Sequence, residues 1–147
     1  MLPGGTGDFE ICVVNSDGTG LTQLTDAPGE SNLPAWSPDG GIVAFQSNRL
    51  GWPTLPEYVP PGYDPERFGE FDIYVMNADG SGVLNLTNHA REDDTFPGWS
   101  RDGHLVFTRY GCFIVMSALR SGVEQLSTGS CTGTDSGEFP DWYQAAQ

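Results

Sequence analysis

Side chains that carry oxygen ligands stand just before a repeated Pro-x-Trp motif in three parts of the chain. Carboxylate and amide oxygens are the ligands that calcium prefers, and the ion takes roughly 6–8 of them. If these side chains meet in the fold, they form a calcium site; if they do not, the acids only cap and solubilise the starts of strands. The candidates are Glu30, Asn32, Asp93, Asp94 and Glu138.

The whole chain is strongly acidic, with 20 Asp and Glu residues, 6 Lys and Arg residues and a formal net charge of −14. Such a surface repels nucleic-acid phosphates and anionic membranes. No apolar run approaches the roughly 20 residues of a membrane-spanning helix. We therefore expect no nucleic-acid partner and no membrane insertion. The first residues do not resemble a signal peptide, so the sequence is either a mature form or a piece of a longer chain.

The sequence contains none of the common catalytic motifs. It has no G-x-S-x-G elbow, no H-E-x-x-H motif, no phosphate-binding loop and no dinucleotide fingerprint. The two histidines, His89 and His104, form no zinc or triad spacing with other residues. We expect no catalytic residues and predict that the protein is not an enzyme.

A strand-turn-strand unit repeats along the chain and indicates an all-β fold. Its first strands lie at 10–18, 72–80 and 112–120, and each is a short apolar run that ends in a turn. Asp-Gly supplies the turn in the first two, as a tight hairpin requires. The second strands are expected at Leu21–Thr25, Val83–Thr87 and Val123–Ser127.

A second set of strands begins at the Pro-x-Trp motif. Its members start at Pro34, Pro97 and Pro140, and the first two lead through Asp-Gly turns into strands at 42–45 and 105–107. Successive motifs are 63 and 43 residues apart, and the excess lies in one insertion. Without the insertion, the period is close to the ~40–45 residues of a four-stranded propeller blade.

Together these motifs resemble the TolB-like propeller repeat, a relative of the WD-repeat blade. The resemblance is specific at residues 31–49 and 71–103 and weaker at 112–127. It implies a β-propeller with four-stranded antiparallel blades, in which the Pro-x-Trp segment is the innermost strand A and strands B, C and D follow outwards. It also implies an extracellular or periplasmic protein that interacts with other proteins.

The order of the strands splits one blade across the termini. The chain begins with strands C and D, runs through two full blades and ends in a further strand A. We expect residues 1–147 to form one partial-ring domain with about three blades, and a ring usually needs roughly 4–8. The missing blades come either from the rest of a longer chain or from a second copy joined head to tail, as a closed ring or as a filament.

The propeller assignment also brings candidate residues together. Loops before successive strands A converge at one mouth of the central channel, which favours calcium as the one expected cofactor. Cys112 opens a strand C and Cys131 follows the next strand D, so both fall at one end of a blade and a disulfide between them fits. Three unpaired small core residues are the alternative. Cys12 aligns with Tyr74 inside a strand and is expected to be a buried free thiol.

The insertion at residues 50–70 is rich in proline and aromatic residues. Prolines stiffen it and prevent a regular strand ladder. Aromatic side chains on a stiff segment can anchor a partner at low entropic cost. The insertion therefore either binds a partner or folds back over its own blade. The aromatic candidates are Trp52, Tyr58, Tyr63 and Phe68.

These features predict a non-enzymatic extracytoplasmic propeller that binds other copies of itself or another protein. The alternative is a propeller segment of a larger TolB-like protein, of a hydrolase or of a polysaccharide lyase. A lyase would need a convergent set of basic residues. Arg49 and Arg109 align as parts of the repeat, which favours a structural role for both.

Overall fold

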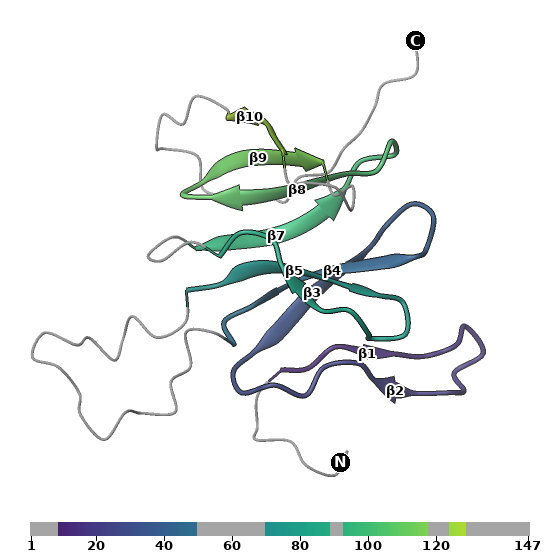
Figure 1. Cartoon of the computed structure of the whole chain (residues 1–147). Helices are drawn as coiled ribbons and strands as arrows, with labels where there is room; N and C mark the ends of the chain where they lie inside the picture. The colour runs from purple at the N-terminus through teal and green to yellow at the C-terminus, as the bar shows by residue number, and fades with distance from the viewer. Residues whose placement is uncertain (1–8, 50–69, 89–92, 118–123, 129–147) are drawn as a thin grey trace, which may run out of the picture.

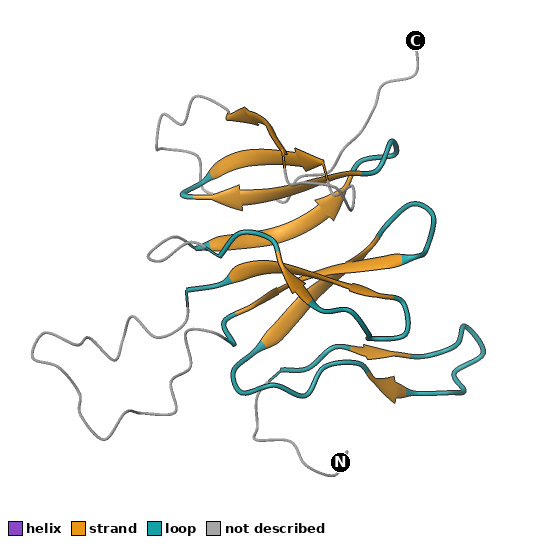
Figure 2. Cartoon of the chain, in the orientation of Figure 1, coloured by secondary structure: helices purple, strands orange, loops and turns teal. Residues whose placement is uncertain are grey.

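The computed structural model describes residues 9–49, 70–88, 93–117 and 124–128. In these residues the chain forms strands and turns without any helix, and hence no helix that could cross a membrane (Figure 2). The strands are β1 (Cys12–Val13), β2 (Thr22–Gln23), β3 (Ser31–Trp36), β4 (Ile42–Ser47), β5 (Asp72–Asn77), β6 (Leu84–Asn85), β7 (Asp94–Trp99), β8 (His104–Arg109), β9 (Cys112–Ser117) and β10 (Glu124–Thr128).

The strands pair with their neighbours in sequence and form three antiparallel sheets. β1 and β2 form a two-stranded sheet, β3 to β6 a four-stranded sheet in chain order, and β7 to β10 a second four-stranded sheet in chain order. The sheets are stacked, with the β1–β2 pair at one end, the β3–β6 sheet in the middle and the β7–β10 sheet at the other end (Figure 1). The predicted all-β class with antiparallel sheets is confirmed.

The core lies in two layers, one on each face of the middle sheet. Successive residues of a strand face opposite sides, so Val43 and Phe45 of β4 belong to one layer and Ala44 to the other. Burying a large apolar side chain stabilises the fold by about 1.5–3 kcal/mol. The layer toward β1–β2 contains Ile11, Val43, Phe45, Tyr74 and Met76, and the layer toward β7–β10 contains Ala44, Ile73, Leu105, Phe107, Ile114 and Met116.

Each innermost strand contains a bulge at its proline. The register of β3 against β4 shifts between Asn32 and Ala35, and the register of β7 against β8 shifts at the equivalent place. Proline cannot donate to a strand ladder, so the pairing is interrupted there. The residues before the two prolines take left-handed backbone angles, with φ of 50° at Leu33 and 56° at Phe96.

The Asp-Gly turns form as predicted, and their side chains close them. Asp79 Oδ1 accepts hydrogen bonds from the Ser81 amide at 2.9 Å and from the Ser81 hydroxyl at 2.6 Å. Gly80 has a φ of 85°, and a Cβ there would lie 3.1 Å from a backbone oxygen of Leu24, so both the angle and the space favour glycine.

The strands differ from their predicted bounds mainly at their ends. β4 and β8 extend to Ser47 and Arg109, beyond the apolar run that marked them in the sequence, because polar residues continue the same ladder with β5 and β9. β2 and β6 are only two residues long. His104, expected in a turn, is the first residue of β8 and places its Nδ1 2.9 Å from Asp102 Oδ2.

Candidate protein-interaction surface

The β1–β2 hairpin and the β5–β6 hairpin are two copies of one structure. Each residue of the first has its counterpart 62 positions later in the chain. The Ile11 amide donates to Thr25 Oγ1 at 2.8 Å, and the Ile73 amide donates to Thr87 Oγ1 at 3.0 Å. These shared contacts allow the surroundings of the two hairpins to be compared residue by residue.

Each hairpin also holds the innermost strand of the next sheet in the same way. The Ser31 amide at the start of β3 donates to the Phe9 carbonyl at 2.7 Å, and the Asp94 amide at the start of β7 donates to the Phe71 carbonyl at 2.7 Å. The passage from one sheet to the next is therefore repeated, which makes the two sheet-to-sheet junctions comparable.

The junction between the two four-stranded sheets is closed by polar contacts as well as by the core. The Trp99 indole Nε1 donates to the Ala35 carbonyl at 3.1 Å, and the Trp99 ring packs against the core layer. The Phe96 amide donates to Gln46 Oε1 at 3.0 Å. Both bonds cross from β7 to the middle sheet, so β3 and β4 serve as the docking surface for β7.

Trp36 occupies the position of Trp99 in the middle sheet but lacks such a neighbour. Trp36 pairs with Val43 in the register, as Trp99 pairs with Leu105. The Trp36 side chain is nevertheless 47% exposed. In the part of the chain that the structure describes, its indole N–H has no hydrogen-bond acceptor, and no strand takes the place that β3 has for Trp99.

Strand β1 is open in two directions where its counterpart β5 is covered. β4 pairs along the whole of β5, but among residues 9–49, 70–88, 93–117 and 124–128 only β2 pairs with β1. Val14 is 51% exposed, whereas its counterpart Met76 is 1% exposed. Cys12, the counterpart of the buried Tyr74, is an exposed free thiol.

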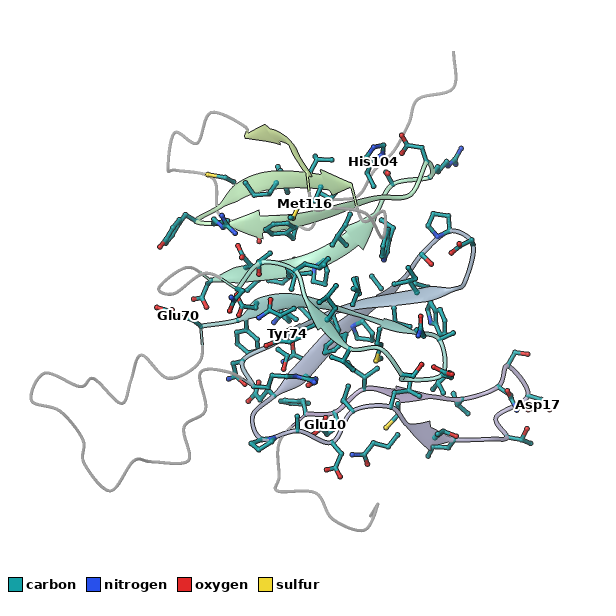
Figure 3. All side chains as sticks on the ribbon, viewed as in Figure 1. Glu10, Asp17, Glu70, Tyr74, His104 and Met116 are labelled. Atoms are coloured by element: carbon teal, nitrogen blue, oxygen red, sulfur yellow. The ribbon has the colours of Figure 1, made fainter. Side chains whose placement is uncertain are left out.

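The prediction that Cys12 is buried is therefore wrong, and the reason is physical. Its strand position is the same as that of Tyr74, but Tyr74 is covered by the β1–β2 sheet, and no described sheet lies on the far side of β1 (Figure 3). We call Cys12, Val14 and Trp36 together the open end of the molecule.

The predicted calcium ligands have other contacts in the structure. Asp94 is fully buried and forms a two-pronged ion pair with Arg109, Nε to Oδ1 at 2.6 Å and Nη2 to Oδ2 at 2.7 Å. Asp93 Oδ1 accepts the Phe71 amide at 2.9 Å. The described residues contain no group of three or more acidic, cysteine or histidine ligands around one point.

Two further members of that set, Glu30 and Asn32, contact each other. Asn32 donates from Nδ2 to Glu30 Oε2 at 3.2 Å, and its Oδ1 is buried without a partner among the described atoms. Glu138 lies outside the described residues. The calcium site stays a prediction, for which the structure shows only this one neighbouring pair.

Two arginines support the starts of the innermost strands, although they are not equivalent in register. Arg109 pairs with Asp94 as Ser47 pairs with Ser31, so the expected alignment of Arg109 with Arg49 is wrong by two positions. Arg49 instead reaches back, with its Nη2 3.0 Å from Ser31 Oγ. Both guanidinium groups thus contact the first residue of an innermost strand, and the structural role stays a prediction for both.

Aromatic rings complete the setting of these arginines. The Arg49 guanidinium lies 4.8 Å from the centre of the Tyr74 ring and 5.2 Å from that of Phe45, and Arg109 lies 5.8 Å from that of Phe107. Burial lowers the pKa of Arg49 and raises the pKa of Tyr74. In the sequence, each arginine comes a few residues after a phenylalanine, which is a signal that could have been used. The sequence does not show that both guanidinium groups contact the first residue of an innermost strand from different places in the strand register.

The predicted disulfide and the insertion fall mostly outside the described residues. Cys112 is disulfide-bonded, and its predicted partner Cys131 lies outside them. The four aromatic residues proposed to anchor a partner also lie outside the described residues: Trp52, Tyr58, Tyr63 and Phe68.

A solved structure of a candidate TolB from Agrobacterium tumefaciens is similar to this fold, with a TM-score of 0.57, 25% sequence identity and coverage of 81% of this chain. The chain is related to the TolB-like β-propellers. It spans 41% of the length of that TolB structure. The β3–β6 and β7–β10 sheets contain the segments that the sequence pattern predicts as blades, and β3 and β7 are the predicted strands A.

The sequence comparisons place the TolB-like chain beside larger proteins. No family model matches it. It is 45% identical over 42 residues to dipeptidyl-peptidase 5 of Porphyromonas gingivalis, which is 29% of this chain and 6% of that protein. The chain therefore spans less than half of the proteins it resembles here.

The sequence predicted head-to-tail contact at the split blade but did not identify Trp36, Val14 and Cys12 as residues of that surface. Trp36 and Trp99 stand in the same motif, and nothing in the motif distinguishes the exposed Trp36 from the partly buried Trp99. A signal was present in the strand order, because among the described residues only the β1–β2 pair comes before the strand that contains Trp36.

Proposed function

We propose that this chain is a non-enzymatic protein-interaction module that assembles with other copies of itself at its open end. The observation that carries the proposal is the contrast between Trp36, Val14 and Cys12 and their covered counterparts. TolB-like proteins resemble this chain and act as protein-interaction platforms in the cell envelope, which supports an interaction role.

The open end has the physical properties of an unfilled contact. An unpaired strand edge presents free N–H and C=O groups, which readily pair with another strand. Covering a large exposed side chain contributes about 1.5–3 kcal/mol. A partner that supplies both a strand edge and an apolar face would therefore bind here with useful affinity.

Copies of this chain would meet head to tail, because the open end differs from the opposite end of the stack. Such contacts close into a ring when the rotation between copies allows it and form a filament when it does not. With about three blades in each chain, two copies would make a ring of about six blades, within the usual range for propellers.

An extracytoplasmic location is part of the proposal. Disulfides form and persist in oxidising compartments, and Cys112 is disulfide-bonded. Detection of this bond by mass mapping of protein from the native compartment, without reduction, supports the location. A reduced Cys112 in protein from that compartment argues against it.

A non-enzymatic role is supported by how the charged residues are used. Arg49 contacts Ser31 and Arg109 contacts Asp94, so both arginines are engaged at the start of a predicted strand A.

Sedimentation velocity of the full chain tests self-assembly directly. The expected result is a mass above the 15.8 kDa of one chain that rises with concentration over about 1–100 µM. Because each copy carries a net charge of −14, added salt should strengthen the association by screening the repulsion. A mass that stays at one chain under all these conditions contradicts the proposal.

A second candidate is a propeller segment of a larger hydrolase. The match to dipeptidyl-peptidase 5 favours it, although that match covers 6% of the peptidase. Release of dipeptides by the product of the complete natural gene would support this candidate. Absence of that activity from a complete product containing no further domain would exclude it.

Calcium binding remains a separate prediction for Glu30, Asn32, Asp93, Asp94 and Glu138. Ligand that binds only the folded state raises its melting temperature. We expect a higher Tm in excess calcium than in chelator if the site exists, and an unchanged Tm would reject it.

A further inference from the structure

We infer that the Trp36 indole is the docking point for the Pro-x-Trp segment at residues 138–142 of a second copy. This inference rests on the proposed self-assembly and specifies which residues meet. In this contact, Trp36 of one copy is the receiving residue, and residues 138–142 of the other copy are the inserted segment.

The molecule contains a filled example of this contact. At the closed junction, the Trp99 Nε1 donates to the main-chain carbonyl of Ala35, 3.1 Å away. Ala35 is the residue just before the tryptophan of the preceding strand A. The acceptor is a backbone atom, so the contact requires a strand A at that place and not a particular side chain.

Trp36 is prepared for the same contact and lacks only the acceptor. Its strand has the same bulge, the same proline and the same pairing position as that of Trp99. The Ser37 hydroxyl that follows it donates to Asp39 at 2.6 Å, as Ser100 donates to Asp102 at 2.5 Å. The indole is therefore held on a well-ordered strand, and its 47% exposure reflects a missing neighbour.

The chain itself contains one further segment of the required type. Residues 32–36 read NLPAW, residues 95–99 read TFPGW and residues 138–142 read EFPDW, so each has an apolar residue, a proline, one variable residue and a tryptophan. The first two are strands A in the structure. The third lies outside the described residues, and by the same spacing the carbonyl of Asp141 would accept the Trp36 N–H.

Single-residue variants of the full chain test the receiving side. Trp36→Phe keeps an aromatic ring and removes the N–H, so it should weaken self-association about threefold to tenfold, as expected for one hydrogen bond. Trp36→Ala also removes the ring and should weaken it more than about thirtyfold, as for a central interface residue. Trp99→Phe is the matched control, which should lower the Tm and leave association unchanged.

A chain that ends at residue 137 tests the inserted side. It should remain monomeric, because it keeps Trp36 but lacks the segment. Trp36→Ala keeps the segment but lacks the receiving residue. Mixing these two variants should restore one contact and give a heterodimer that grows no further, which sedimentation would show as a single species of about twice the chain mass.

The outcomes separate the two proposals. If the unaltered chain never exceeds the mass of one copy, self-assembly is wrong and this inference fails with it. If the unaltered chain assembles and Trp36→Ala assembles equally well, self-assembly stands and the Trp36 contact is overturned. Assembly by the chain ending at 137 likewise overturns the assignment of the 138–142 segment.

Discussion

The two junctions of the middle sheet, one with the β7–β10 sheet and one with the β1–β2 pair, offer an instructive comparison. Trp99 lies at a closed junction, with its ring against the core and its N–H bonded to Ala35. Trp36 has the same local sequence and the same strand geometry but is 47% exposed. The difference between them is not in either residue or its turn. It lies in the neighbouring sheet, which is complete beside Trp99 and only a hairpin beside Trp36.

The comparison shows that burial in a repeat protein is decided by neighbours more than by motif. Each repeat buries one face against the unit before it and the other against the unit after it. A residue at an end of the described stack therefore keeps its strand position and loses its cover. The function of such an end therefore depends on which partner can bury its exposed side chains.

The largest effect is expected where the closed junction buries a charge. Asp94→Ala removes the fully buried carboxylate that bonds to Arg109 Nε and Nη2 and should lower the free energy of unfolding by about 3–5 kcal/mol. Ser31→Ala, at the equivalent position of the middle sheet, removes one neutral contact of Arg49 and should cost about 1 kcal/mol. Urea denaturation measures the free energy of unfolding of both variants. Equal losses would show that the Asp94–Arg109 ion pair stabilises the fold no more than the neutral Arg49–Ser31 contact does.

Core truncation should separate the covered strand from the open one. Met76→Ala removes a side chain that is 1% exposed and should cost about 2–5 kcal/mol. Val14→Ala, 62 positions earlier, changes an exposed side chain and should stay within about 0.5 kcal/mol in a dilute monomer. A large loss for Val14→Ala at low concentration would mean that another part of the same chain covers the open end.

The hairpins themselves should respond alike, because their internal contacts are the same. Thr87→Val removes the acceptor of the Ile73 amide, and Thr25→Val removes the acceptor of the Ile11 amide. Leaving a buried amide unsatisfied should cost about 1–3 kcal/mol in each case. Hydrogen exchange of these two amides is the measurement, and protection lost in only one hairpin would show that the two are not equivalent.

The smallest effect is expected from the turns as the pH falls. Hydrogen bonds from Ser81 hold the pKa of Asp79 below its usual 3.8, and those from Thr19 do the same for the pKa of Asp17. A lowered pKa in the folded state stabilises the fold above about pH 3.8, and this stabilisation is lost as the pH falls through the lower folded value. Denaturation between pH 5 and about pH 2 should show the loss.

Asp79→Asn is the control for the pH experiment. It removes the titrating group while keeping a side chain that can close the turn. The part of the pH dependence that belongs to Asp79 should disappear in this variant. An unaltered pH profile would assign the loss of stability to other carboxylates.

Much of the fold follows from local patterns that the sequence displays directly. Asp-Gly turns between short apolar runs predicted the hairpins, because glycine alone adopts the required backbone angle without strain. The Pro-x-Trp motif predicted the start of each strand A. The strand ends were less predictable, since β4 and β8 continue through polar residues whose pairing depends on the neighbouring strand.

The sequence by itself thus determined the strands, their turns, the antiparallel order and the demand for a neighbouring blade, because these depend on residues close together in the chain. Only the tertiary structure decided which equivalent residues are covered. It paired Asp94 with Arg109 and left Cys12 and Trp36 exposed, since burial and ion pairing depend on what lies across the junction between sheets. The open end is therefore a property of the stack of sheets and cannot be found in any one repeat.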